Sequence, residues 1–180
     1  MWCFGYGGHA FAGSLSREME YDADRHAIHL VGSKAFVQSM ANIERYGAAH
    51  GVAMKNAHSL FYETSVLVQN IPKFTLYIGK TMPADSLRQI AAENEAKKQH
   101  LLDTHPPTRE RVAVATEANV AGIFKLNRPA TDLIHHWENL AIETTADFYS
   151  DVLGQRVTAL EMTPLEEVLK EEHRMTLQKV

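Results

Sequence analysis

The sequence predicts a mainly α-helical fold with little or no β-structure. Most of the 180 residues fall into segments whose apolar side chains recur at helical rather than alternating spacing. Glycine and proline stand at the ends of these segments, where helices commonly begin or end. Only residues 74–78 form a short apolar stretch compatible with β-structure, and the sequence leaves open whether they form a strand or an extended lid.

Most of the expected helices begin or end at a residue whose chemistry favours a helix boundary. Gly32 ends the first helix, and Pro83 opens a charged helix at its first position. Gly122 and Gly154 stand just past the ends of two later helices. The segment 163–166 reads Thr-Pro-Leu-Glu, a capping box that predicts a terminal helix. The helices bounded by these glycines and by Pro83 cover residues 15–31, 84–101, 108–121 and 137–153, and two more are expected at 35–50 and 57–69.

The composition excludes some classes of protein. Hydrophobic residues make up 45% of the chain and charged residues 22%, which is ordinary for a folded domain, and one domain is the simplest count. The net charge of −4 argues against a nucleic-acid-binding protein, because phosphate binding requires clustered Lys and Arg. The single cysteine, Cys3, excludes an internal disulfide framework.

Residues 1–13 differ from the rest of the chain. They read MWCFGYGGHAFAG, which is aromatic, rich in glycine and free of charged residues. No stretch reaches the roughly 20 apolar residues that a bilayer-spanning helix needs. The segment could be a frayed end or the end of a membrane segment, and its composition leaves both open. We therefore divide the chain into an apolar lead-in, 1–13, and a folded part, 14–180.

Two acidic residues in the first expected helix lie where apolar residues are expected. On a helical wheel, Glu20 and Asp24 fall in the middle of the face that carries Ala27, Ile28 and Val31. Carboxylates are almost never fully buried unless they are paired or bound to metal. They could form buried salt bridges to Arg or Lys, or Glu20 could be a metal ligand supported by Asp24.

Two motifs resemble those of one enzyme family. Residues 16–24, SREMEYDAD, resemble the SRxxExxAD signature of zinc metallopeptidases related to the CaaX prenyl protease and the HtpX heat-shock protease. Residues 103–111, DTHPPTRER, resemble the THPPxxxR element of the same family. Pro106 restricts His105 to an extended backbone. His105 could instead merely cap the helix that begins at Thr108.

This resemblance implies roles for four residues. Glu20 corresponds to the carboxylate ligand of zinc in these gluzincins, and Asp24 to the acid that hydrogen-bonds a ligating His. His105 and Arg111 correspond to the active-site element, in which we expect His105 to hydrogen-bond the tetrahedral oxyanion. The fold implied is the mainly α, multi-helix half of a gluzincin-like peptidase domain.

The sequence lacks the other half of such a site. Gluzincins bind zinc through a His-Glu-x-x-His helix whose Glu activates water, and none of the ten His residues here forms that motif. His26 and His29 lie on the wheel face opposite Glu20, and His135 and His136 are adjacent, so their side chains diverge on a helix. We expect the missing segment to lie upstream or on another chain.

The function implied is therefore incomplete in this chain. We expect the carboxyl-terminal portion of a membrane-associated zinc metalloendopeptidase, of the bacterial inner-membrane type, that acts on a protein or peptide and is inactive as the isolated chain. Its zinc would find one ligand here and the others elsewhere. The alternative is a non-catalytic helical remnant that serves as a scaffold or regulatory module of a protease system.

Overall fold

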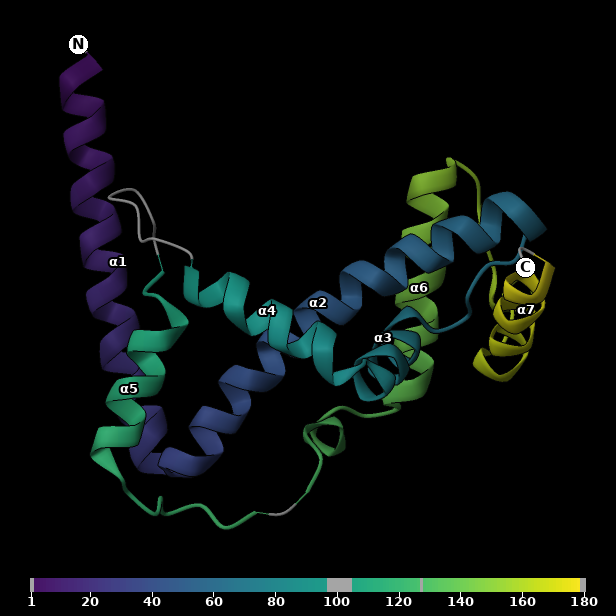
Figure 1. Ribbon diagram of the computed structural model, residues 1–180. Helices are drawn as coiled ribbons and strands as arrows, with labels where there is room; N and C mark the ends of the chain where they lie inside the picture. The colour runs from purple at the N-terminus through teal and green to yellow at the C-terminus, as the bar shows by residue number, and fades with distance from the viewer. Residues whose placement is uncertain (1, 97–104, 127, 179–180) are drawn as a thin grey trace. The chain divides into compact units, whose positions relative to one another are not determined.

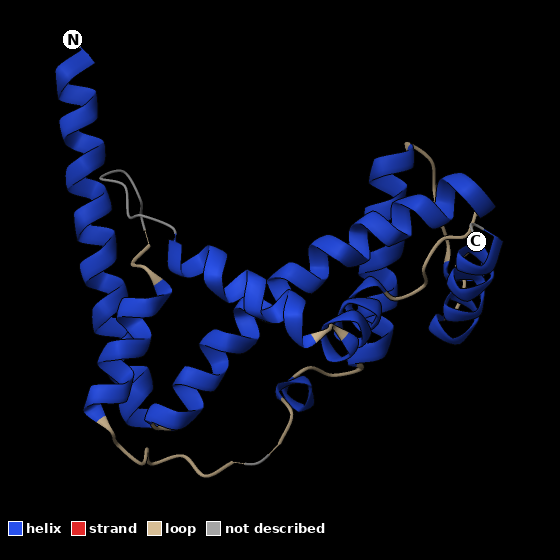
Figure 2. Ribbon diagram, in the orientation of Figure 1, coloured by secondary structure: helices blue, strands red, loops and turns tan. Residues whose placement is uncertain are grey.

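The computed structural model describes residues 2–96, 105–126 and 128–178, and it confirms a mainly α-helical fold (Figures 1 and 2). Over these residues it has seven α-helices, two short 3-10 helices and no strand. The β-type pairing recorded there is an isolated bridge between Val68 and Thr163. The elements are α1 (Trp2–Val31), α2 (Ser33–Thr64), α3 (Ile71–Thr81), α4 (Ala84–Ala96), α5 (Thr108–Ala118), η1 (Ala130–Leu133), α6 (Trp137–Leu153), η2 (Ala159–Glu161) and α7 (Leu165–Gln178).

The chain divides into two compact units. The first comprises Met1–Glu44 and Ala84–Asn127, and the second comprises Arg45–Pro83 and Arg128–Val180. Helices α1, α4 and α5 belong to the first unit, and α3, α6 and α7 to the second, while α2 contributes residues to both. Both family-like motifs therefore fall in the first unit.

Two helices are longer than the sequence predicts. Helix α1 has 30 residues and continues through position 13, where the apolar lead-in was expected to end. Helix α2 has 32 residues. It joins the two helices expected at 35–50 and 57–69 through Gly47 and Gly51 without a break, and it ends at Thr64 rather than at residue 69. Within the described part of the chain, no helix is both long and apolar enough to cross a membrane. The charged helix α4 is described to Ala96, so the last expected helical residues, 97–101, lie outside the described residues.

Residues 74–78 are helical, so both alternatives considered for them, a strand and an extended lid, are wrong. They lie inside α3, where Phe74 is fully buried. The side chain of Asn70 accepts a hydrogen bond from the backbone N–H of Lys73 at 2.8 Å, which caps the helix. Pro72 stands in the first turn, where its missing N–H costs no intrahelical bond. The sequence Asn-Ile-Pro thus begins a helix here.

The first unit is built on a corner between α1 and α2. Ile28 and Phe36 pack with Ala115 of α5 in a small apolar cluster. Gly32 joins the two helices with a φ of +91°, a backbone conformation that favours glycine. The backbone N–H groups of Ile123 and Phe124 donate to the carbonyl of Leu30, each at 2.9 Å. These bonds attach the chain that follows α5 to the corner.

The second unit has two adjoining apolar clusters. The first lies between α2, α3 and α7, and the second between α3, α6 and the segments that flank η2. The members of the first are Ala53, Ala57, Leu60, Val68, Phe74 and Val168. The members of the second are Leu67, Ile71, Ala146, Tyr149, Val157 and Met162.

Candidate functional site

Asp24 is buried in α1, as the helical wheel predicts, but the buried face is rotated from the expected one. Asp24 is 5% exposed and Ile28 is 2% exposed. Val31, expected on the buried face, is 41% exposed, whereas Tyr21, which follows Glu20 on the helix, is half-buried. Helix α5 packs on the Tyr21 side of α1, which explains the rotation. The wheel could not show this, because it contains no information about a helix that follows more than 80 residues later.

Asp24 is held by Arg111 from the first turn of α5. The Nε and Nη2 groups of Arg111 donate to the two oxygens of the Asp24 carboxylate, at 2.6 and 2.7 Å. This two-pronged geometry is the strongest that a guanidinium and a carboxylate can form. The hydrogen bonds to Asp24 raise the pKa of Arg111 above its usual value, although burial opposes the shift, and the charges of Asp24 and Glu20 add to it. The salt bridge considered from the sequence is therefore present at Asp24.

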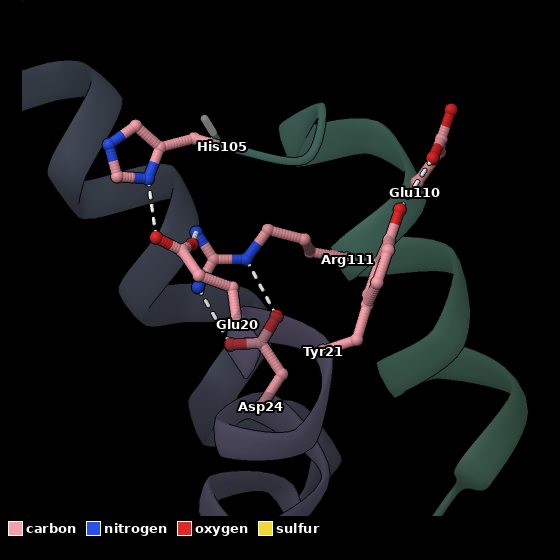
Figure 3. Close-up of polar contacts among 6 residues, drawn as sticks. All are labelled: Glu20, Tyr21, Asp24, His105, Glu110 and Arg111. Atoms are coloured by element: carbon pink, nitrogen blue, oxygen red, sulfur yellow. Dashed lines mark hydrogen bonds and ion pairs between the residues drawn. The ribbon is translucent and has the colours of Figure 1, made fainter. Parts of the chain in front are cut away.

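Glu20 lies one helical turn before Asp24 and contacts two side chains of the second motif, the imidazole of His105 and the guanidinium of Arg111 (Figure 3). One of its oxygens contacts Nδ1 of His105, and the other lies 3.5 Å from Nη1 of Arg111. The Glu20 side chain is 27% exposed, so solvent still reaches it. Arg111 thus bridges Glu20 and Asp24, and His105 contacts Glu20 from the other side.

His105 reaches Glu20 because of the two prolines that follow it. Pro107 is the residue before the first turn of α5, and its carbonyl accepts the N–H of Glu110 at 3.0 Å. Among the described residues no side chain hydrogen-bonds to the start of this helix, so His105 does not serve as its cap. The imidazole extends instead toward α1, and 74% of the side chain is exposed. The first two residues of the motif, at 103 and 104, lie outside the described residues.

Sequence reasoning missed one contact of this site. The hydroxyl of Tyr21 donates a hydrogen bond to Oε2 of Glu110 at 2.7 Å. Burial is the largest contribution that raises the pKa of Tyr21, to about 12, and the hydrogen bond and charge of Glu110 add to it. The sequence did offer a hint of this contact. Both residues lie within the two motif segments, where Tyr21 follows Glu20 and Glu110 precedes Arg111.

The residues gathered here do not by themselves fit a zinc ion. A stable protein zinc site requires three or four N, S or O ligands around the metal. Among the residues that the structure describes, no group of three or more His, Cys, Asp or Glu side chains could hold a metal ion. Both oxygens of Glu20 face His105 and Arg111. The assignment of Glu20 as a zinc ligand, and of Asp24 as support for a ligating His, therefore stays a prediction.

Comparison with known proteins identifies the family. The family model of peptidase family M48 matches residues 4–119, more than half of the chain, and this range contains both motifs and all six residues of the site. No curated protein and no solved structure matches the chain significantly. The match extends well beyond the motifs and agrees with the contacts between them, and the chain therefore belongs to peptidase family M48, a family of zinc metallopeptidases.

Proposed function

We propose that this chain is the carboxyl-terminal portion of a membrane-associated zinc metalloendopeptidase, with Glu20 as a ligand of the zinc. One observation carries the proposal. Two motifs far apart in the sequence meet in space: Glu20 of α1 lies against His105, 85 residues later, and against Arg111 of the same second motif. Membership of family M48 supplies the class of reaction, which is peptide hydrolysis. The uncharged, aromatic start of the chain and the family's general association with membranes support the location.

The geometry suggests what each residue contributes. The pairing with Asp24 fixes the guanidinium of Arg111, and this guanidinium in turn holds the Glu20 carboxylate in place. His105 is accessible to a bound peptide because most of its side chain is exposed. With Nδ1–H directed at Glu20, its Nε2 can donate to an oxyanion only when the ring is protonated.

We further propose that the isolated chain does not hydrolyse peptides. The residues of this chain include no His-Glu-x-x-His motif, and the described residues form no group of metal ligands. The His ligands and the general base must then come from a segment outside these residues or from another chain. The partners expected are that segment and a protein or peptide substrate.

Zinc content and hydrolysis together test the proposal. The purified chain is expected to bind well under one zinc ion per molecule and to leave a fluorogenic peptide uncut. The nucleotide sequence upstream of Met1 is then read for an in-frame His-Glu-x-x-His motif, and the longer product is expressed. We expect Glu20→Gln to abolish its activity and its zinc binding, while Glu18→Gln, an exposed acid on the same helix, leaves both in place.

Two outcomes would contradict this assignment. Unchanged turnover in Glu20→Gln would remove Glu20 from the active site. Stoichiometric, chelator-sensitive zinc in the isolated chain, lost in Glu20→Gln, would show that the 180 residues suffice for the metal site. The first result contradicts the role of the residue, and the second contradicts only the incompleteness of the chain.

One observation favours a second function, that of a non-catalytic scaffold or regulatory module. Glu20 and Asp24 of α1 already have polar partners in Arg111 and His105, so the four residues can serve as a structural network. This alternative predicts no His-Glu-x-x-His motif upstream. It also predicts that Glu20→Gln changes stability but no enzymatic property.

A further inference from the structure

The hydrogen bond between Tyr21 and Glu110 lies beside the ion-pair network without being part of it (Figure 3). Tyr21 is the neighbour of Glu20 on α1, and Glu110 is the neighbour of Arg111 on α5. Each helix therefore contributes two consecutive residues to the contact between α1 and α5. One member of each pair belongs to the ion-pair network, and the other belongs to the Tyr21–Glu110 bond.

Consecutive residues on a helix point about 100° apart. Glu110 and Arg111 thus leave α5 in different directions. Their partners Tyr21 and Asp24 are three residues apart on α1 and point about 60° apart around that helix. A single polar link would let α5 rotate about its own axis around that link. Two links on different sides of the contact fix both the rotation and the register of α5 on α1.

Apolar packing alone defines this rotation poorly. Ala115 is the one residue of α5 that is fully buried, and Val112 is partly buried against the same cluster. Two small side chains make few contacts that would distinguish one rotation of a helix from another. Polar contacts must therefore supply most of the orientation of α5.

We propose that Tyr21 and Glu110 are positioning residues for the site at Glu20. Their hydrogen bond holds α5 in the rotation at which Arg111 reaches both Glu20 and Asp24. The contact between Nη1 of Arg111 and Glu20, at 3.5 Å, is longer than the contacts to Asp24 and responds first to a rotation. His105 is connected to the start of α5 by Pro106 and Pro107, so the rotation of α5 also sets the position of His105. This inference rests on the proposed function in so far as Glu20 is the residue that the pair positions.

The test uses the whole chain labelled with ¹⁵N and observes the Nε–H group of Arg111 by NMR. Tyr21→Phe keeps the ring and removes only the donor, and Glu110→Ala removes the acceptor. Loss of one hydrogen bond is expected to increase exchange of the Arg111 Nε–H with solvent by roughly two- to tenfold and to shift its resonance. Glu110→Gln keeps an acceptor oxygen and is expected to restore the wild-type exchange.

A matched control separates positioning from general loss of stability. Val112→Ala weakens apolar packing at the same contact between α1 and α5 without touching either polar link. It is expected to lower the melting temperature but to leave the Arg111 signal in place. Wild-type exchange in Tyr21→Phe would overturn the inference, and so would an equal change in Val112→Ala.

The two proposals fail in different ways. If Glu20→Gln leaves a longer, active product unaffected, Glu20 has no catalytic role, yet the Tyr21–Glu110 pair can still be shown to orient Arg111. If Tyr21→Phe leaves Arg111 unchanged, the positioning role is wrong, and the zinc and hydrolysis measurements on Glu20 still decide the function.

Discussion

Asp24 is the residue whose environment has the clearest energetic consequence. Its carboxylate is buried in α1 and is paired with a guanidinium whose side chain is 22% exposed. Removal of one partner of such a pair leaves a buried charge without compensation, which costs far more than the pair contributes while both partners are present. The salt bridge is therefore a strong constraint on the sequence, even though its net contribution to stability is modest.

Arg111→Gln is expected to destabilise the chain by about 2–4 kcal/mol, at the lower end of the range for buried pairs because solvent reaches part of the guanidinium. Chemical denaturation with urea measures the loss. Arg128→Gln is the matched control, since Arg128 pairs with Asp132 at 2.9 Å on the surface, and about 1 kcal/mol or less is expected there. Equal losses in the two variants would show that Asp24 is not effectively buried.

The double variant adds a second check at the same pair. Replacing Asp24 by Asn removes the charge that Arg111→Gln would leave uncompensated. The loss in Asp24→Asn with Arg111→Gln should therefore be smaller than the sum of the two single losses. Additive losses would mean that the two residues do not interact energetically.

At the scale of the element, the corner between α1 and α2 depends on two glycines that approach each other closely. A Cβ atom on Gly32 would lie 2.6 Å from the carbonyl oxygen of Ala121, which is backbone and cannot move aside cheaply. A Cβ atom on Gly122 would lie 2.3 Å from the backbone N of Gly32. Both glycines also have positive φ. The backbone conformation and the lack of space for a Cβ atom therefore both favour glycine at these positions.

Gly32→Ala is expected to cost about 2 kcal/mol or more, from the left-handed backbone conformation and the clash together. Gly51→Ala tests the opposite case within α2, because a Cβ atom on Gly51 would have no neighbour within 4 Å and the backbone there is ordinary helix. That change is expected to stabilise the chain by about 0.5–1 kcal/mol. Thermal unfolding of both variants shows the difference, and a stabilised Gly32→Ala would refute the strained corner.

The sequence predicts the elements of this fold better than it predicts their faces. Gly154 ends α6, as expected, and Pro83 directly precedes α4 rather than standing at its first position, since the helix begins one residue later at Ala84. Gly51 does not interrupt α2, because a lone glycine costs only about 1 kcal/mol in a helix that tertiary packing supports. The stretch around Phe74 is helical because Asn70 caps it and because the core favours that packing over strand propensity.

In the candidate site, too, the sequence predicts some features and not others. Glu20, Asp24, His105 and Arg111 can be identified from two motifs, because each motif restricts a short local arrangement. The contact between Tyr21 and Glu110 cannot, because it depends on the rotation of α5 about its axis on α1. That rotation arises from packing between segments far apart in the sequence, about which helical periodicity carries no information.

At the scale of the whole molecule, the two units are expected to respond differently to pH. The first unit carries its buried acid as an ion pair. The second unit carries Glu172 of α7, which accepts a hydrogen bond from Asn56 of α2 at 2.9 Å. Burial raises the pKa of Glu172 above its usual value, and the hydrogen bond from Asn56 only partly opposes the shift. Ionisation of Glu172 is thus less favourable in the folded unit than in the unfolded chain.

The sign of the effect follows from proton binding. Because the pKa of Glu172 is higher in the folded chain than in the unfolded one, the folded chain holds more protons between the two values. The stability that this group contributes is complete below its unfolded pKa, near 4.5, and is lost as the pH rises through the folded pKa. Glu172 is only partly buried, so solvent screening limits the size of the loss.

Hydrogen exchange of the α7 amides, expressed as protection factors between about pH 4 and pH 7, measures this loss. We expect protection in α7 to fall with rising pH in the wild-type chain and to stay nearly level in Glu172→Gln, which resembles the protonated acid. Glu167→Gln, a change of an exposed acid on the same helix, should leave the fall in place. If Glu172→Gln retained the full fall, the carboxylate would not be the group responsible, and the pH response of the second unit would have to come from elsewhere in that unit.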